Sequence, residues 1–179
     1  MTMNALKIFL DIGLLKAKPQ DVPFSYQLLA LATVTSIVAY ILALEPATPE
    51  LARILGTQNS IVMMSLAEHG FFALTVWVIL KLRGCPTRFT QALTAMFGVS
   101  TIIRIIVWLV VSLLAADKES SGAGLAGMLV FGLSLWIWVV YAHIFKETLE
   151  TRFGVGMMYT IASQVITSML LLTVIEVNF

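Results

Sequence analysis

Residues 26–45 read YQLLALATVTSIVAYILALE, a run with no charged side chain before Glu45. A helix needs about 20 apolar residues to cross the hydrocarbon core of a bilayer, so this stretch predicts a membrane span. Pro46 and Pro49 follow and end the helix, because proline lacks the backbone N–H that a helix requires. Of the 179 residues, 59% are apolar and 12% are charged, against about 45–50% and about 25% in globular domains. The sequence therefore predicts an all-α polytopic membrane protein and argues against a soluble enzyme domain.

Four further stretches of the chain have the length and hydropathy of spans. They cover residues 61–80, 99–116, 123–145 and 155–175. With the first span they make residues 26–179 a five-helix transmembrane domain, and residues 1–25 precede it as a cytoplasmic N-terminal arm. Because each span uses about 20 residues plus a connection, the chain has no room for a sizeable soluble domain.

The third apolar segment is longer than one span. Residues 89–116 would form about 42 Å of helix, which exceeds the hydrocarbon thickness of about 30 Å. Its first part carries Thr90, Gln91 and Thr94, which are poorly suited to contact lipid. We therefore expect an amphipathic lead-in that bends near Gly98 before the span begins, with a single strongly tilted helix as the alternative.

Residues 4–17 (NALKIFLDIGLLKA) have the pattern of a short amphipathic helix. Lys7 and Asp11 are four residues apart on one side of such a helix. A second side carries the apolar residues Leu6, Phe9, Leu10, Leu14 and Ala17. This pattern predicts a helix that lies in the membrane interface. A packed N-terminal arm is the alternative interpretation.

Lysine and arginine collect on one side of the predicted membrane. Eight of the eleven lie in the arm or in loops on its side, namely Lys7, Lys16, Lys18, Lys81, Arg83, Arg88, Lys146 and Arg152. Arg53 and Lys118 fall on the opposite side, and Arg104 lies within a span. Because basic residues favour cytoplasmic loops, we expect a cytoplasmic N-terminus and a C-terminus on the far side. The short loops and the absence of a recognisable cleavable signal fit a bacterial inner membrane.

Three ionisable residues fall inside predicted spans: Glu68, His69 and Arg104. A charge at bilayer depth costs about 2.5 kcal/mol or more, so such residues are candidates for function. Glu68 and Arg104 lie at similar depths in consecutive spans, which favours an ion pair that neutralises both. A proton or ion relay through Glu68 and His69, and a lipid-headgroup or substrate pocket built on Arg104, are the alternatives.

A metal centre has little support in the sequence. The chain has two histidines, His69 and His143, and one cysteine, Cys85. Glu68 and His69 are adjacent, so on a helix they point about 100° apart and do not converge on one ion. We therefore expect no metal and no cofactor. His143, close to the polar loop that begins at Lys146, is expected to lie at the membrane interface.

Small residues mark faces where another helix backbone can approach closely. Gly124, Gly127 and Gly132 give the fourth span such a face, and Ser163 with Thr167 gives the fifth span a weaker one. We expect the glycine face to pack within the protein's own bundle, with self-association or binding of another membrane protein as the alternative.

The sequence contains no motif that carries catalysis. It has no phosphate-binding glycine-rich loop, no HExxH pair and no GxSxG elbow. A net charge of +1 gives no electrostatic footprint for nucleic acid. We therefore expect a protein that is not an enzyme and whose partners are membrane lipids and other membrane proteins.

The chain resembles the Yip1-type family of small five-span membrane proteins, in its bacterial branch. Three stretches carry the resemblance: PQDVP at 19–23, RFTQALTAMFG at 88–98, and LWIW at 135–138 with the polar loop from Lys146. The resemblance implies a cytoplasmic N-terminus, five spans and a binding or trafficking role without catalysis. The Rab GTPase partners of eukaryotic members are not implied, because only about 25 residues precede the first span.

Two functional hypotheses follow. The first is a non-enzymatic inner-membrane protein, similar to Yip1-type proteins, that acts as a binding or accessory subunit for other membrane components. The second is a small transporter or proton-coupled channel subunit that uses Glu68, His69 and Arg104. A lipid-modifying enzyme is disfavoured because no nucleophile with a neighbouring base is visible in the sequence.

Overall fold

The computed structural model describes residues 5–44, 58–114 and 122–178. These ranges form α1 (Ala5–Gly13), η1 (Pro19–Asp21), α2 (Tyr26–Leu44), α4 (Gln58–Leu82), η3 (Pro86–Arg88), α5 (Phe89–Leu114), α6 (Gly122–Leu149) and α7 (Phe153–Asn178). Five of the helices, α2 and α4 to α7, are long and apolar enough to cross a membrane. No strand occurs in the described ranges. The predicted all-α polytopic fold is confirmed.

The helices begin and end where their sequences supply or remove backbone partners. The Ser25 hydroxyl accepts a hydrogen bond from the Leu28 N–H at 3.2 Å and so caps the start of α2. At the other end of the next span, Gly84 adopts a φ of 73°, and the following Cys85 N–H donates back to the Leu80 carbonyl at 2.9 Å. Glycine adopts this left-handed conformation without strain, so α4 ends there and the chain turns into α5.

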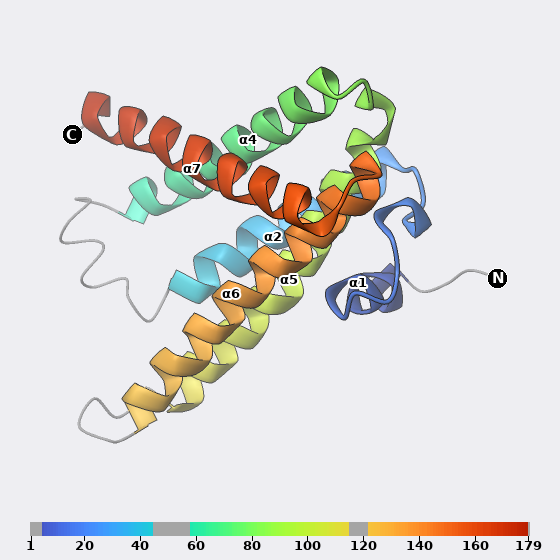
Figure 1. Cartoon of the computed structure of the whole chain (residues 1–179). Coiled ribbons are helices and arrows are strands. Elements are labelled where there is room, and N and C mark those ends of the chain that lie inside the picture. Colours follow the sequence, from blue (N-terminus) through green and yellow to red (C-terminus); the bar gives the residue numbers. More distant parts are fainter. Residues whose placement is uncertain (1–4, 45–57, 115–121, 179) are drawn as a thin grey trace.

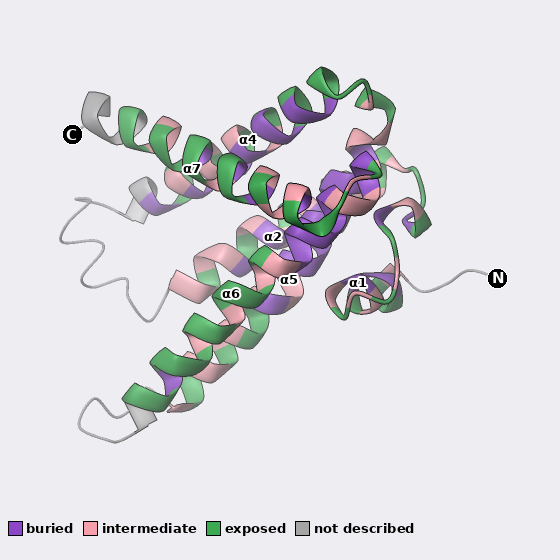
Figure 2. Ribbon diagram, in the orientation of Figure 1, coloured by how far each residue is buried: buried purple, intermediate pink, exposed green. Residues whose placement is uncertain are grey.

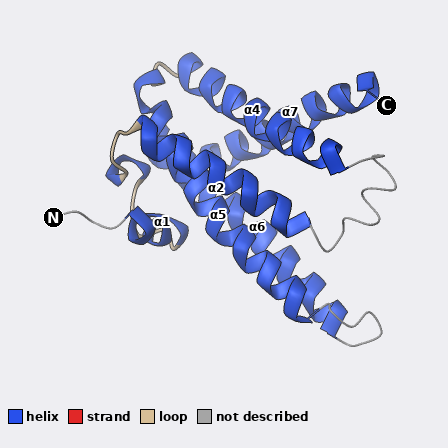
Figure 3. Ribbon diagram, turned by 180° about the vertical axis from the view of Figure 1, so that it is seen from behind, coloured by secondary structure: helices blue, strands red, loops and turns tan. Residues whose placement is uncertain are grey.

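The five spanning helices form two groups. Figures 1 and 3 show that α2, α5 and α6 lie alongside one another, which we call the three-helix bundle. The helices α4 and α7 cross each other and diverge from the bundle, and we call them the helix pair. The two groups join at the end of the molecule that holds the α4–α5 and α6–α7 turns.

The tightly packed core lies at this joined end. On α5 the residues from Thr90 to Ser100 are buried except for the half-buried Gln91, and on α6 the residues from Val140 to Phe145 are buried. The opposite halves of both helices are mostly half-buried or exposed (Figure 2). Large exposed side chains on those halves, such as Leu113 and Met128, are suited to contact lipid.

The predicted bend near Gly98 does not interrupt α5, which runs unbroken from Phe89 to Leu114. Of the polar residues that favoured a bend, Thr90 and Thr94 are buried and Gln91 is half-buried. The Gln91 side-chain amide donates to the carbonyls of Gln20 at 3.1 Å and Val22 at 2.8 Å. With these donors satisfied by the N-terminal arm, the first turns of α5 need no interfacial position and the helix continues directly.

The helix α1 combines the two predicted interpretations of the N-terminal arm. Ile8, Phe9 and Ile12 are buried in the core that α5 and α6 share. Leu6, Leu10 and Leu14 form a stripe along the opposite side and are 55%, 44% and 56% exposed. Of the predicted apolar side, only Phe9 therefore packs on the bundle fully. The helix is a packed arm that also presents leucines to its surroundings.

Three hydrogen bonds fasten the arm to α6. The Trp136 indole Nε1 donates to the Gly13 carbonyl at 3.0 Å, the His143 Nε2 donates to the Ala17 carbonyl at 3.0 Å, and the Gln20 amide donates to the Glu147 carbonyl at 2.7 Å. His143 is only 9% exposed. The arm therefore covers the His143 ring and accepts its N–H, while its position at the membrane interface stays a prediction.

The same end of the molecule gathers the arm and both turns. Lys18 Nζ lies 3.4 Å from a Glu147 carboxylate oxygen. Arg88 donates to the Thr148 carbonyl at 2.7 Å and also pairs with Glu150. The segments that carry the eight predicted cytoplasmic basic residues are thus neighbours in space. Arg53 and Lys118, predicted on the opposite side, lie outside the described residues.

The fourth-span glycines, predicted to form a packing face, make no close contact with another helix within the described residues. A Cβ added at Gly124, Gly127 or Gly132 would meet no atom of the described chain within 4 Å. The close approach is made instead at Gly156 of α7, where a Cβ would collide with the Ala142 carbonyl oxygen of α6. The weaker fifth-span face behaves as expected, since Ser163 and Thr167 are buried.

Candidate functional site

The three intramembrane ionisable residues meet where the helix pair contacts the three-helix bundle. Arg104 of α5 donates through Nη2 to Glu68 Oε1 of α4 at 3.3 Å. Their side chains are 20% and 25% exposed, so both are largely removed from the surroundings. This geometry matches the ion pair predicted from their similar depths in consecutive antiparallel spans. The pairing removes the cost of two separate charges at bilayer depth.

His69 contacts the other terminal nitrogen of the same Arg104 guanidinium. Arg104 Nη1 lies 3.2 Å from His69 Nε2, and His69 Nδ1 lies 2.7 Å from the Ser65 carbonyl oxygen. A carbonyl only accepts, so Nδ1 carries the proton and the unprotonated Nε2 accepts from arginine. Glu68 and His69 point in different directions, yet the two-ended guanidinium reaches both. The ring is neutral in this arrangement, because a proton on Nε2 would face the arginine N–H.

Two buried serines extend this contact across α2 and α5. Ser36 Oγ lies 3.0 Å from His69 Nε2 and 2.8 Å from Ser100 Oγ. Ser100 Oγ also lies 3.0 Å from the Phe97 carbonyl oxygen. We call Ser36, Glu68, His69, Ser100 and Arg104 the polar cluster. Its members come from α2, α4 and α5, so its polar contacts connect the helix pair to the bundle.

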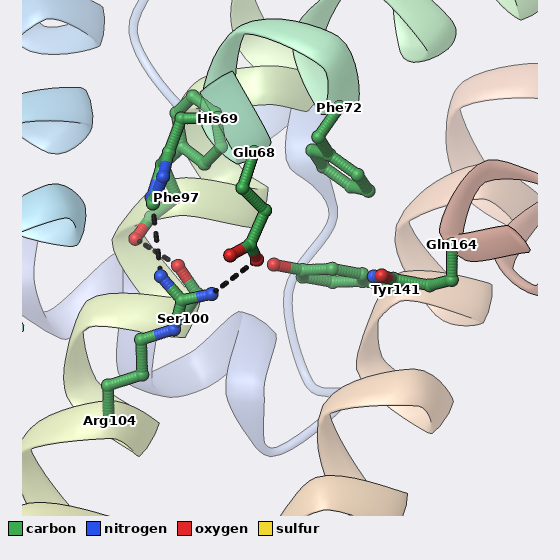
Figure 4. A pocket seen from close by; sticks show the side chains of 8 residues that line it. All are labelled: Glu68, His69, Phe72, Phe97, Ser100, Arg104, Tyr141 and Gln164. Atoms are coloured by element: carbon green, nitrogen blue, oxygen red, sulfur yellow. Dashed lines mark hydrogen bonds and ion pairs between the residues drawn. The ribbon is translucent and has the colours of Figure 1, made fainter. Parts of the chain in front are cut away.

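Aromatic rings enclose the polar cluster (Figure 4). The Arg104 guanidinium carbon lies 4.5 Å from the centroid of the Tyr40 ring, a cation–π distance. The His69 and Phe97 rings are 5.2 Å apart, and the Phe72 and Tyr141 rings are 5.4 Å apart. These rings hold the charged side chains in a low-dielectric setting, where electrostatic interactions are stronger than in water.

Two cavities adjoin the polar cluster. The smaller, of about 20 Å³, is bounded by Glu68, Arg104 and Tyr141 among others, and is large enough for one water molecule. The larger, of about 400 Å³, shares these three residues, and we call it the central cavity. Its volume falls in the range of small-molecule sites, roughly 300–1,000 Å³.

Every spanning helix contributes to the wall of the central cavity. The polar part consists of Tyr40, Glu68, Arg104, Ser134, Tyr141 and Gln164. The apolar part consists of Ala43, Leu44, Ile103, Val107, Val130, Leu133, Ile137 and Trp138. Leu44 lies at the last described position of α2, so the cavity extends from the polar cluster toward the ends of the helices that diverge.

The side chains of the site can form hydrogen bonds to a ligand and can accept or release a proton. The cluster has one cation, one anion and a neutral imidazole, so it is neutral overall and presents hydrogen-bonding groups at one end of an apolar cavity. Within the described ranges, no group of three or more His, Cys, Asp or Glu side chains is placed to hold a metal ion.

Sequence reasoning identified the charged members of the site and missed the neutral ones. Ser36, Ser100, Tyr40, Tyr141 and Gln164 carry no charge, and hydroxyl or amide residues occur along every span. The one sequence feature that points to Ser36 and Ser100 is their position near the middle of a helix, away from the loops at both ends. Charge stands out in an apolar sequence, whereas a buried serine does not.

No family model, no curated protein and no solved structure matches the chain. The five apolar helices nevertheless establish the general class, an all-α protein built to span a membrane.

Proposed function

We propose that the protein is a non-enzymatic binding protein of the membrane that takes an amphipathic bilayer component into the central cavity. The observation that carries the proposal is the composition of this cavity of about 400 Å³, in which all five spans line a largely apolar space and the polar cluster contributes Glu68 and Arg104 to the wall. Apolar walls suit hydrocarbon, and a few convergent polar groups suit a headgroup. In this role the protein would serve other membrane components as a binding or accessory subunit, in the manner of the Yip1-type proteins that its sequence resembles.

The setting of this proposal is the bacterial inner membrane, with the N-terminus in the cytoplasm and the C-terminus on the opposite side. The clustering of the N-terminal arm with the α4–α5 and α6–α7 turns supports it, because these segments hold the eight basic residues of one side. The central cavity then extends toward the outer leaflet, and the packed core separates it from the cytoplasm.

A cavity-filling variant tests the proposal. Val107 lines the central cavity, and Val107→Phe places a ring in its apolar part. Val34 is 59% exposed and does not line the cavity, so Val34→Phe is the matched control. We expect native mass spectrometry from mild detergent to show a bound lipid with the unmodified chain and with Val34→Phe, and much less with Val107→Phe. Equal lipid retention by all three proteins would contradict the proposal.

Proton-coupled transport is the second candidate, and one observation favours it. Ser100, Ser36, His69, Arg104 and Glu68 form a continuous series of contacts of 2.8 to 3.3 Å. Purified protein in vesicles with an internal pH-sensitive dye distinguishes the two functions. A transporter moves protons in response to a pH gradient and loses this activity in Glu68→Gln, whereas a binding protein shows no proton flux in either form.

A further inference from the structure

A second cavity lies beneath the N-terminal arm. Its volume is about 260 Å³, and we call it the arm groove. It is lined by Ala5, Leu6 and Phe9 of α1, Leu28, Leu31, Ala32 and Thr35 of α2, and Gly98, Thr101 and Ile102 of α5. None of these residues lines the central cavity, so the two sites are separate.

The lining of the arm groove excludes a polar occupant. Its only polar side chains are Thr35 and Thr101, and both hydroxyls already donate to carbonyls of their own helices. Thr35 donates to Leu31 at 2.9 Å and Thr101 donates to Phe97 at 2.8 Å. The groove is larger than a 150 Å³ apolar cavity of the kind that stays dry and binds apolar molecules. Its chemistry therefore fits hydrocarbon.

The position of the groove places it next to the hydrocarbon chains of the membrane lipids. Two of its three walls are the spanning helices α2 and α5. At its rim Leu6 and Leu31 are 55% and 60% exposed, so the groove opens sideways and the described residues do not close it. A space that opens sideways between membrane-spanning helices meets lipid chains before it meets water. The roof is Phe9, whose ring is close enough to α5 that only glycine fits at position 98.

The arm places positive charge beside the same rim. Lys7 is exposed and directly follows the rim residue Leu6. An ammonium group at a membrane surface attracts anionic lipid headgroups. We propose that the arm groove binds one acyl chain of an anionic phospholipid of the leaflet next to the N-terminal arm, with its headgroup held by Lys7.

Photo-crosslinking of the reconstituted full chain tests this site. The probe is a phosphatidylglycerol with a diazirine midway along one acyl chain, in vesicles of phosphatidylcholine. We expect cross-links in residues 5–9, 28–35 and 98–102. Ala32→Phe fills the groove from α2, and should lower this labelling about tenfold, which is the effect of displacing about two buried methylenes. Ala30→Phe is the matched control, because Ala30 is exposed on the same helix and does not line the groove.

Ala32 is buried in the core, so Ala32→Phe also tests the folding of the chain. A second variant at an exposed position separates the two effects. Leu31→Trp adds bulk from the exposed rim and should lower the labelling in the same direction. Unchanged labelling in Leu31→Trp and in a folded Ala32→Phe would mean ordinary surrounding lipid and would overturn the proposal.

The headgroup preference is tested by competition. Unlabelled phosphatidylglycerol should displace the probe better than unlabelled phosphatidylcholine, and Lys7→Gln should remove the difference. Equal competition in the unmodified chain would overturn the anionic preference. Val107→Phe should leave groove labelling unchanged, so the outcome here is independent of the outcome at the central cavity.

Discussion

The guanidinium of Arg104 joins an acid and a neutral base at once, donating to Glu68 at 3.3 Å and to His69 at 3.2 Å. Only arginine offers two such ends in one rigid plane, because the lysine ammonium is a single point charge. The arrangement explains why two adjacent residues of α4, which point about 100° apart on a helix, act on the same partner in α5.

The ion pair predicts a non-additive effect on stability. Glu68→Gln leaves the Arg104 charge without its partner, and Arg104→Leu does the same to Glu68, so each single change should lower the free energy of unfolding by about 3 kcal/mol. The double variant should lose much less than the sum, because no unpaired charge remains. Unfolding in detergent, analysed as a double-mutant cycle, measures the coupling.

The surface pair of Lys18 and Glu147 is the control for this cycle. The Lys18 side chain is 64% exposed, so the coupling of this pair should stay below about 1 kcal/mol. Losses at Glu68 and Arg104 that simply add would contradict a paired role and would leave each residue with a separate function.

The two histidines should differ in tautomer. His69 donates through Nδ1 to the Ser65 carbonyl, and His143 donates through Nε2 to the Ala17 carbonyl. At a pH where both rings are neutral, ¹⁵N NMR of the labelled protein should show one ring protonated at each kind of nitrogen. His143→Gln assigns the remaining signal to His69, since the chain has only two histidines. The same tautomer in both rings would contradict the hydrogen-bond pattern of the polar cluster.

At the scale of single residues, the sequence predicts the charged members of the site. Glu68 and Arg104 are conspicuous among apolar neighbours, and their depths alone suggest that they meet. The partner serines are not conspicuous, because a hydroxyl in a span can always donate to a carbonyl of its own helix, as Thr94 does to Thr90 at 2.6 Å. Whether it reaches another helix depends on packing that the sequence does not state.

At the scale of helices, the contrast between α6 and α7 shows the limit of spacing rules. Gly124, Gly127 and Gly132 have the spacing of a packing face, yet a Cβ added at any of them would meet no other element of the described chain within 4 Å. Gly156 has no such pattern around it but lies directly against the α6 backbone. Spacing describes a face of a helix, whereas burial depends on which helix lies opposite.

Two glycines near the start of α7, Gly154 and Gly156, allow a test of this contrast. Gly156→Ala should lower stability by about 1–3 kcal/mol, because its Cβ meets backbone atoms of α6 that cannot rotate away. Gly154→Ala is the matched control two residues earlier, where a Cβ meets nothing within 4 Å, and it should cause no loss. Thermal unfolding in the same detergent compares the two. Equal melting temperatures would show that α6 and α7 are further apart than described.

At the scale of the whole molecule, the number of spans and the basic end are predictable, while the grouping of helices is not. Hydropathy gives five spans because each is a continuous apolar run. The pairing of α2 with α5 and of α4 with α7 skips over neighbours in sequence. Apolar side chains of similar shape cover all five helices, so the choice of partner depends on a few polar and small residues, such as the Ser36–His69 contact and Gly156.

The orientation of the whole molecule can be tested at Cys85, the only cysteine in the chain. Cys85 is partly exposed in the turn between α4 and α5, at the end that also holds the N-terminal arm. If the basic residues of this end face the cytoplasm, a membrane-impermeant thiol reagent should label Cys85 only after intact cells are permeabilised. The reverse control combines Cys85→Ser with Lys118→Cys, which moves the thiol to the loop predicted on the far side, and should be labelled without permeabilisation. Labelling of Cys85 in intact cells would invert the topology and direct the central cavity toward the cytoplasm.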